Sequence, residues 1–123
     1  MTVYISSELN DHVTMNNDTG ADLDQYEFCV VGPYAAIADD DIDSLDDGSF
    51  HVAGGIQFQT DDLVLGELTF ATQGQEVFWS AADEAFSDTE TAGYYLIGYL
   101  VEVKDSDGVI VVEKTRYATL ITT

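Results

Sequence analysis

Carboxylates are the most abundant residues in this chain that could do chemistry. There are 24 Asp and Glu, and the densest run, "DDDIDSLDDGS", covers residues 39–49. A calcium loop needs oxygen ligands at alternate positions and a glutamate at position twelve. In the register that begins at Asp43, Leu45 falls on position three and Gly54 on position twelve. We therefore interpret the run as a solvated acidic loop, with weak and non-specific cation binding as the alternative.

The other residue types used in catalysis do not form a motif. His12 and His51 lie far apart, with no further His and no nearby Cys to complete a zinc site. No serine lies in a G-x-S-x-G motif, and "VAGGI" at residues 52–56 lacks the lysine and the helix of a phosphate loop. A pair of carboxylates for glycoside chemistry carries no information among 24 acids. We expect no enzyme activity, no cofactor and no metal.

The balance of charge restricts the partners. Only Lys104, Lys114 and Arg116 are basic, so the formal net charge is -21. This field repels nucleic acid and anionic membranes, and it favours cationic, apolar or uncharged partner surfaces. It also opposes compaction, and salt screens that repulsion. The composition thus suggests adaptation to a salty habitat, with an ordinary acidic protein as the alternative.

Size and composition indicate one folded domain. The chain has 123 residues, 46% of them hydrophobic, which is enough for a single core. Cys29 is the only cysteine, so no internal disulfide is expected, and its apolar surroundings predict a small buried side chain. No run of 18 apolar residues occurs, and the start has no pattern of a secretory signal, so neither a membrane helix nor a signal peptide is expected.

The elements that would position these residues are mainly β. Short runs of β-branched and aromatic residues, separated by Gly, Asp or Ser, begin at Tyr26 and continue to the C-terminus. This spacing predicts a small barrel-like or sandwich-like domain over residues 25–123. Residues 1–24 show one short β-like run, Val3–Ile5, followed by a polar stretch. We expect these residues to form an extended N-terminal arm.

Two local predictions follow from the C-terminal half. The sequence "VEVKDSDGVIVVEK" predicts a hairpin, and in its second strand Ile110, Val112 and Lys114 share one face. Both faces of this strand begin apolar and become polar, which is typical of a strand that leaves the core toward an edge or an interface. The sequence "SAADEAF" after Trp79 could form one helical turn, with Ser80 as N-cap and Asp83 in the capping position. We therefore expect at most one short helix in the domain.

The order of these elements resembles the capsid decoration, or cement, proteins of tailed bacteriophages and archaeal tailed viruses. Val77, Phe78 and Trp79 match the "VYW" element of that family, and Ile97 with Gly98 matches its "IG" element. Asp107 and Gly108 with Val109–Val112 match the last turn and strand, and "DQYEFCVVGPYAAIA" is similar to the early strands. The similarity covers residues 26–120, and the acidic run at residues 39–47 departs from it.

The resemblance implies a β-tulip-like fold and a mechanical role. Members of this family decorate the outside of an icosahedral capsid as homotrimers, after assembly in the host cytoplasm, and clamp adjacent capsomers of the expanded shell. The implied partners are the major capsid protein and further copies of the chain, and neither nucleic acid nor a membrane. The arm is expected to contact the shell through its apolar residues Val3, Tyr4, Ile5 and Leu9. Trp79 is expected to anchor the acidic turn that follows it to the core.

A second function, from another class, stays open at this point. A β-sandwich spike that binds a glycan or a receptor would present aromatic residues in a groove. Six tyrosines are candidates for it: Tyr4, Tyr34, Tyr94, Tyr95, Tyr99 and Tyr117. Aromatic residues in strands are more often part of the core, which favours the structural role.

Overall fold

The described part of the chain folds into nine β-strands. A computed structural model describes residues 11–65 and 69–122, and it contains no α-helix in these ranges. The mainly β fold is confirmed, and the strands pair antiparallel in one open sheet. The strands are β1 (His12–Asn16), β2 (Phe28–Val31), β3 (Tyr34–Ala38), β4 (Asp47–His51), β5 (Ile56–Thr60), β6 (Glu76–Ser80), β7 (Ala85–Ser87), β8 (Tyr95–Glu102) and β9 (Ile110–Leu120).

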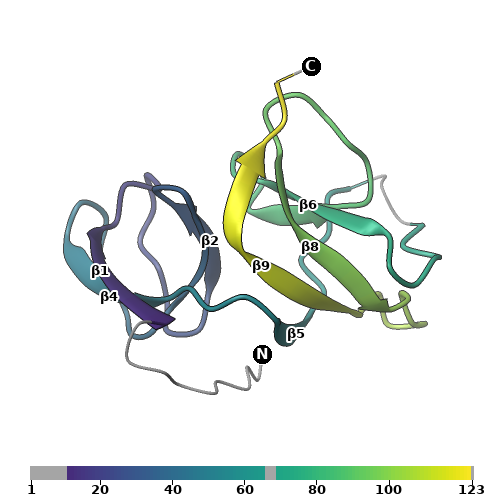
Figure 1. The fold of residues 1–123 in the computed structure, drawn as a ribbon, viewed down its shortest axis with the longest axis horizontal. Helices are drawn as coiled ribbons and strands as arrows, with labels where there is room; N and C mark the ends of the chain where they lie inside the picture. The colour runs from purple at the N-terminus through teal and green to yellow at the C-terminus, as the bar shows by residue number, and fades with distance from the viewer. Residues whose placement is uncertain (1–10, 66–68, 123) are drawn as a thin grey trace.

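The sheet is divided into two lobes (Figure 1). The first lobe holds β1 to β4, and the second holds β5 to β9, in the path β1-β4-β3-β9-β8-β6-β7 with β2 beside β3 and β5 beside β9. The two lobes meet where Tyr34 of β3 pairs with Tyr117 of β9. Next to this pair, the Ala118 N–H donates to the Pro33 carbonyl oxygen at 2.9 Å. A narrow hydrogen-bonded connection therefore joins the halves of the sheet.

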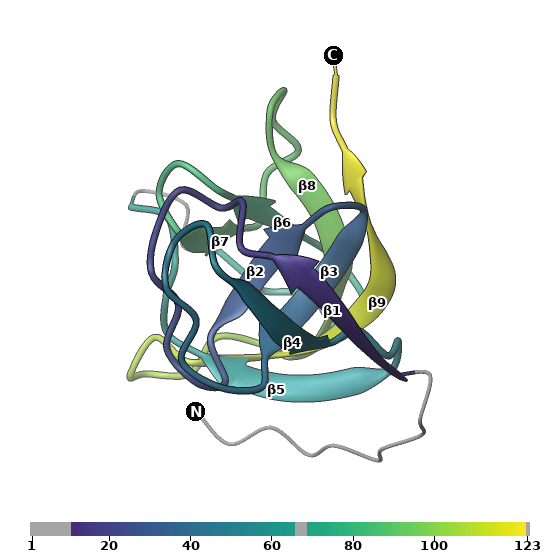
Figure 2. The same ribbon diagram turned by 90° about the vertical axis from the view of Figure 1, so that its left-hand side faces the viewer.

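The β2–β3 hairpin is buried on both faces, because it lies between the β1–β4 pair of its own lobe and the second lobe (Figure 2). Phe28, Ala35 and Ile37 belong to the core of the second lobe. The alternate residues belong to the core of the first lobe: Cys29, Val31, Ala36 and Ala38. This explains the uninterrupted apolar runs "FCVV" and "YAAIA", since a strand covered on both sides has no polar face. Cys29 is buried, and burial raises the pKa of its thiol to about 12.

Strand β9 is the central element of the second lobe. It pairs with β5 on one side and with β8 on the other, and the predicted β8–β9 hairpin is confirmed. Its buried residues alternate as expected, with Ile110, Val112 and Lys114 facing inward, and its end becomes exposed. Gly98 of β8 lies opposite Lys114, and a Cβ at Gly98 would collide with the Glu113 carbonyl oxygen. Only glycine allows β8 and β9 to approach this closely.

Lys114 is a fully buried cation, with a side chain that is 1% exposed. Its ammonium group donates hydrogen bonds to the carbonyl oxygens of Ala35 at 2.8 Å, Ala53 at 2.6 Å and Thr115 at 3.1 Å. All three donor positions of the ammonium are therefore used. Burial, with a smaller effect of Arg116, lowers the pKa of Lys114 to about 8. Lys114 thus links β9 both to the β2–β3 hairpin and to the segment between β4 and β5.

One expectation from the sequence differs from the structure, and one possibility that it left open is decided. The folded domain is expected from the sequence to begin at residue 25, after the arm, but it begins earlier. Strand β1 pairs with β4, and Leu23 forms a bridge with Ile42 and is buried. The residues between β1 and Leu23 are mostly polar and give no core signal. Their loop is held by hydrogen bonds, among them those from the Asn17 side chain to the carbonyl oxygens of Ala21 and Ile42. After Trp79, residues 81–84 form a turn and the chain continues as β7, so the capping pair of Ser80 and Asp83 closes a hairpin instead of a helix.

His51 is buried without a partner for either ring nitrogen. Its ring lies edge-on to that of His12, with 4.6 Å between centroids, and His12 Nδ1 is 2.7 Å from the Asp39 carboxylate. Burial is the main cause that lowers the pKa of His51, and the nearby His12 adds to it. The neutral imidazole is therefore the form that suits this site.

We expect the substitution Lys114→Met to lower the free energy of unfolding by about 2–4 kcal/mol, because three buried carbonyls lose their donor. The folded pKa of about 8 lies below the ordinary lysine pKa of 10.5, so the unfolded chain keeps the proton up to a higher pH. Wild-type stability should therefore rise between pH 8 and 10.5 through this group, and the difference from the variant should grow. Urea denaturation at pH 7.5 and 9.5 measures both effects. Lys104→Met is the matched control, and an equal loss in that control would contradict the role of Lys114.

We expect His51 to make the fold sensitive to acid. Its folded pKa is lower than the unfolded value, so the unfolded chain takes up the proton first and stability falls as the pH drops below about 6.5. In the His51→Phe variant this contribution disappears, and the loss of stability between pH 7.5 and 5 should be smaller than in the wild type. Denaturation midpoints at the two pH values test this. Equal losses in both proteins would show that His51 does not contribute.

Candidate binding site between the two lobes

A pocket of about 600 Å³ opens between the lobes. One wall is residues 24–28, where the β1–β2 connection enters β2. The opposite walls are the end of β5 with residues 58–62 and the β6–β7 hairpin, and Val109 completes the lining. The pocket is in the size range of ligand sites, about 300–1,000 Å³, and it lies at the kind of boundary where such sites occur.

Four rings form the floor of this pocket, and we refer to Phe28, Phe58, Trp79 and Phe86 as the aromatic floor. Trp79 lies 4.9 Å from Phe28 and 4.8 Å from Phe86 between ring centroids, and Phe28 is 5.0 Å from Phe86. These distances are those of attractive aromatic pairs. Each ring is at most 6% exposed, so the floor is part of the core and only a small part of each ring is open to the pocket.

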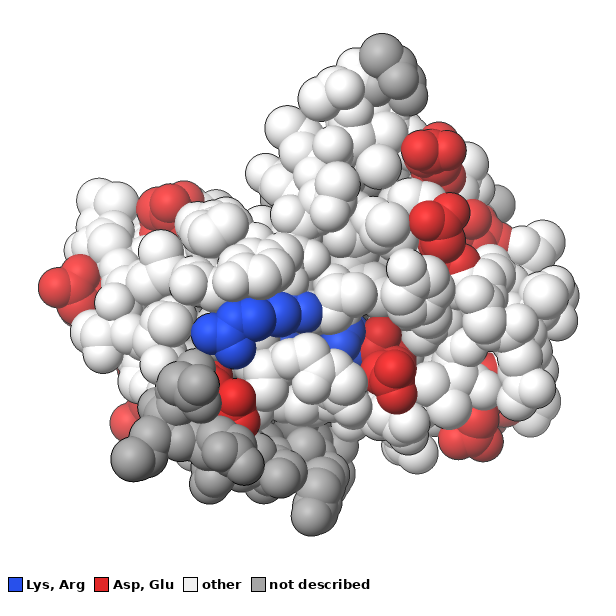
Figure 3. Space-filling view, viewed as in Figure 1, with Lys and Arg blue, Asp and Glu red and all other residues white. Residues whose placement is uncertain are grey.

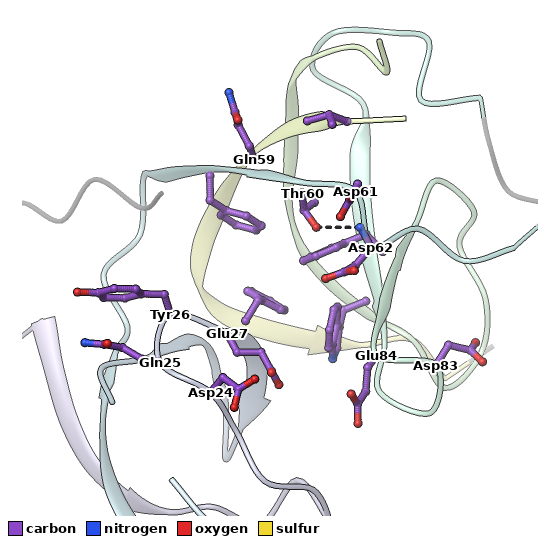
Figure 4. Close-up of a pocket in the computed structure, with 15 residues that line it drawn as sticks. Asp24, Gln25, Tyr26, Glu27, Gln59, Thr60, Asp61, Asp62, Asp83 and Glu84 are labelled. Carbon is purple, nitrogen blue, oxygen red and sulfur yellow. Dashed lines mark hydrogen bonds between the residues drawn. The ribbon is translucent and has the colours of Figure 1, made fainter. Parts of the chain in front are cut away.

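Five carboxylates surround the floor, and we refer to Asp24, Glu27, Asp61, Asp62 and Glu84 as the acidic rim. Figure 4 shows Asp24 and Glu27 next to each other and Glu84 across from them, with Asp61 and Asp62 at the other end of the pocket. The sixth acid, Asp83, points away and accepts a hydrogen bond from Ser80. Within the described part of the chain, no cationic side chain pairs with the rim.

The electrostatics of Glu27 show that the rim converges from both lobes. Burial is the main cause that raises the pKa of its carboxyl group, and the negative charges of Asp24, Glu84 and Asp62 raise it further. A hydrogen bond from the Asp24 backbone acts in the opposite direction and lowers the pKa. Asp24 belongs to the first lobe, whereas Asp62 and Glu84 belong to the second. A like charge disfavours ionisation, so the closed arrangement of these acids has an electrostatic cost.

Two residues of the pocket also have an unfavourable backbone. Tyr26 has a φ of 68° and Glu84 a φ of 51°, and neither is a glycine. The left-handed region costs about 1–2 kcal/mol for a residue with a Cβ. Such outliers are frequent at functional sites, where the surrounding structure holds them.

The β6–β7 hairpin explains why the only tryptophan precedes an acidic turn. Trp79 pairs with Phe86 across the hairpin, so both rings lie on the same floor. The Asp83 N–H donates to Ser80 Oγ at 3.2 Å, and Ser80 Oγ donates back to the Asp83 carboxylate at 2.9 Å. This closed turn brings Glu84 to the edge of the pocket. Trp79 thus lies in the core, where the sequence analysis places it, and also lines the pocket.

The remaining candidates from the sequence lie elsewhere. Val3, Tyr4, Ile5 and Leu9 are outside the described residues. The acidic rim was missed, because its members come from three separated segments whose acids resemble those of ordinary loops. In the ranges that the structure describes, no three His, Cys, Asp or Glu side chains are arranged to hold a metal ion. Nor does a helix long and apolar enough to cross a membrane occur there.

The surface is mainly acidic, as the composition of the chain predicts. In Figure 3, acidic side chains are spread over both lobes, and the basic ones form a strip at the junction between them. Strand β9 contributes Lys114 and Arg116 to the chain's three basic residues. Two of the three cations therefore lie on the strand that connects the lobes.

Comparison with curated proteins and with solved structures gives no match to this chain. The family model described as phage cement protein matches residues 7–115. The matched range contains both lobes and the elements "VFW" and "IG" that carry the resemblance. This range is most of the chain, and it gives the protein a structural role associated with the viral capsid. The chain belongs to the phage cement protein family.

Proposed function

We propose that this protein binds the outside of an icosahedral tailed-virus capsid and stabilises the expanded shell by clamping adjacent capsomers. The family match over residues 7–115 carries the proposal. The partner is the major capsid protein, and the chain acts as a homotrimer on the shell. A rigid β-domain with a double core suits a protein whose task is to resist deformation.

One exposed surface supports contact between copies, and we refer to Tyr34, Arg116, Tyr117 and Leu120 as the β9-end surface. The rings of Tyr34 and Tyr117 are stacked at 5.5 Å, and the Arg116 guanidinium lies 5.8 Å and 5.9 Å from their centroids. Tyr117 is 55% exposed and Leu120 49%. Tyrosine and arginine are enriched at protein interfaces, where they provide much of the binding energy. We assign this surface to the contact within the homotrimer.

The apolar residues that precede β1 are proposed as the contact with the shell. Val3, Tyr4, Ile5 and Leu9 are grouped before the first strand, in a sequence with few other apolar residues until Leu23. They are uncharged, so they avoid the repulsion that the rest of this acidic chain would meet on an acidic surface.

The alternative, a spike that binds a glycan or a receptor, receives less support. It needs aromatic faces open to the ligand, whereas the rings of the aromatic floor are at most 6% exposed. The exposed tyrosines Tyr26, Tyr99 and Tyr117 lie on different elements. The proposal therefore remains with the structural role.

We expect simultaneous replacement of Val3, Tyr4, Ile5 and Leu9 by serine to weaken shell binding at least tenfold, because each buried apolar side chain contributes about 1.5–3 kcal/mol. The thermal stability of the free protein should stay close to that of the wild type. Co-sedimentation with undecorated shells of the encoding virus measures the affinity, and Ser6→Ala with Ser7→Ala is the control. Full occupancy by the serine variant would exclude these residues as the contact.

We expect Tyr117→Ser combined with Leu120→Ser to reduce trimer formation on decorated shells severalfold, because the exposed centre of the β9-end surface is lost. Chemical cross-linking followed by mass analysis measures the trimer yield. Tyr99→Ser with Val103→Ser is the matched control, since both residues are 43% exposed and lie outside that surface. An unchanged yield in the first variant, or an equal loss in the control, would argue against the assignment.

A further inference from the structure

We propose that the pocket between the lobes binds an arginine or lysine side chain carried by a segment of the shell protein. The methylene groups of this side chain would lie on the aromatic floor, and its charged head would lie among the carboxylates of the acidic rim. This inference rests on the proposed function, because it takes the shell protein as the partner.

The rim has the charge for such a ligand. None of its five carboxylates pairs with a cation in the described residues. Glu27 has a hydrogen bond from the Asp24 backbone, and Figure 4 shows a second bond between pocket residues, from the Asp62 N–H to Thr60 Oγ1. Burial is the main cause of the raised pKa of Glu27, and the negative charges of Asp24, Glu84 and Asp62 add to it. A cation among these groups would replace repulsion by attraction. Glu27 is half-buried and the other four carboxylates are exposed, so this attraction should weaken as salt is added.

The Trp79 indole provides an independent indication that the ligand is a peptide. Trp79 is 6% exposed and lines the pocket, and its N–H donates no hydrogen bond to any residue that the structure describes. Among the described residues only the ring nitrogens of His51 are buried without a partner, so the Trp79 N–H is accessible and free to donate to a ligand in the pocket. The backbone carbonyl of a bound segment would supply an acceptor, whereas a metal ion would not.

The aromatic floor suits the methylene groups of a basic side chain. Arginine and lysine bury their methylene groups along apolar surfaces while the charged head stays in polar surroundings. Here the edges of four rings adjoin five carboxylates within one pocket of about 600 Å³. A small hydrated cation would leave this apolar floor without a contact, so the long amphipathic side chain is the better match.

A second copy of the chain is a poor source of this side chain. Of the three basic residues, Lys114 is buried and fully hydrogen-bonded. Lys104 has an interaction of its own, and Arg116 packs against Tyr34 and Tyr117. The occupant must therefore come from another protein, and the capsid shell is the surface on which the cement family acts.

The first experiment uses the full chain and the peptide acetyl-Arg-Arg-Arg-amide at fixed ionic strength. The readout is the indole N–H resonance of Trp79, which is the only tryptophan. We expect a saturable shift with this peptide and none with the uncharged analogue in which citrulline replaces arginine. The double variant Glu27→Gln, Glu84→Gln should weaken binding about tenfold, because two charge-assisted contacts are lost.

A matched variant separates a specific pocket from the general field of an acidic protein. Glu90→Gln with Asp107→Asn removes two charges from exposed positions outside the pocket and should leave the affinity within about twofold. Equal weakening by the two double variants, or no indole shift with the arginine peptide, would overturn the proposal. A shift with calcium chloride but not with the peptide would assign the pocket to a metal ion and would also overturn it.

The second experiment adds undecorated shells. We expect the Glu27→Gln, Glu84→Gln variant to bind them more weakly than the Glu90→Gln, Asp107→Asn variant. If both bind as the wild type does, the shell does not occupy the pocket and the inference is wrong, although the proposed function stands. If the wild type itself does not bind shells, the proposed function fails, and with it the shell as the source of the side chain.

Discussion

The arrangement of the two lobes depends on the hydrogen bonds of Lys114. A buried ammonium is tolerated only when its donors are satisfied, and here the acceptors are carbonyls of the β2–β3 hairpin, of the β4–β5 segment and of β9 itself. The position of β9 relative to the first lobe is thereby fixed in more than one direction. Apolar packing alone is less directional, because it responds to area and not to orientation.

The pocket concentrates features that lower the stability of the free protein. Its carboxylates repel each other, and Tyr26 and Glu84 adopt a left-handed backbone. The rigid parts of the fold lie directly beneath it, since the aromatic floor belongs to the core of the second lobe. Local strain of this kind persists where the surroundings over-determine it. The arrangement is understandable if the preferred state of the rim is one with a bound cation.

Much of the fold could be predicted from the sequence, and the pocket could not. Alternation along Ile110, Val112 and Lys114 predicted the inward face of β9, and Asp-Gly predicted its hairpin. The first lobe was partly missed, because β1 consists of "HVTMN", which has little β-pattern and is held by its pairing with β4. From the sequence, Lys114 is assigned to the polar end of a strand, because no local signal distinguishes a buried lysine from an exposed one. The rim joins residues 24–27, 61–62 and 84, and their proximity is a property of the tertiary structure alone.

The length and position of β9 have a mechanical consequence. This single strand pairs with β5 and β8 and reaches β3 of the first lobe. Tension along its axis would shear the hydrogen bonds to these neighbours, so that all of them bear the force at once. They would not break one after another. Forced unfolding is governed by the barrier to the first rupture, so simultaneous loading raises the resistance of the whole domain. A pull on the C-terminal end of the chain would accordingly be shared between both lobes before any strand separates.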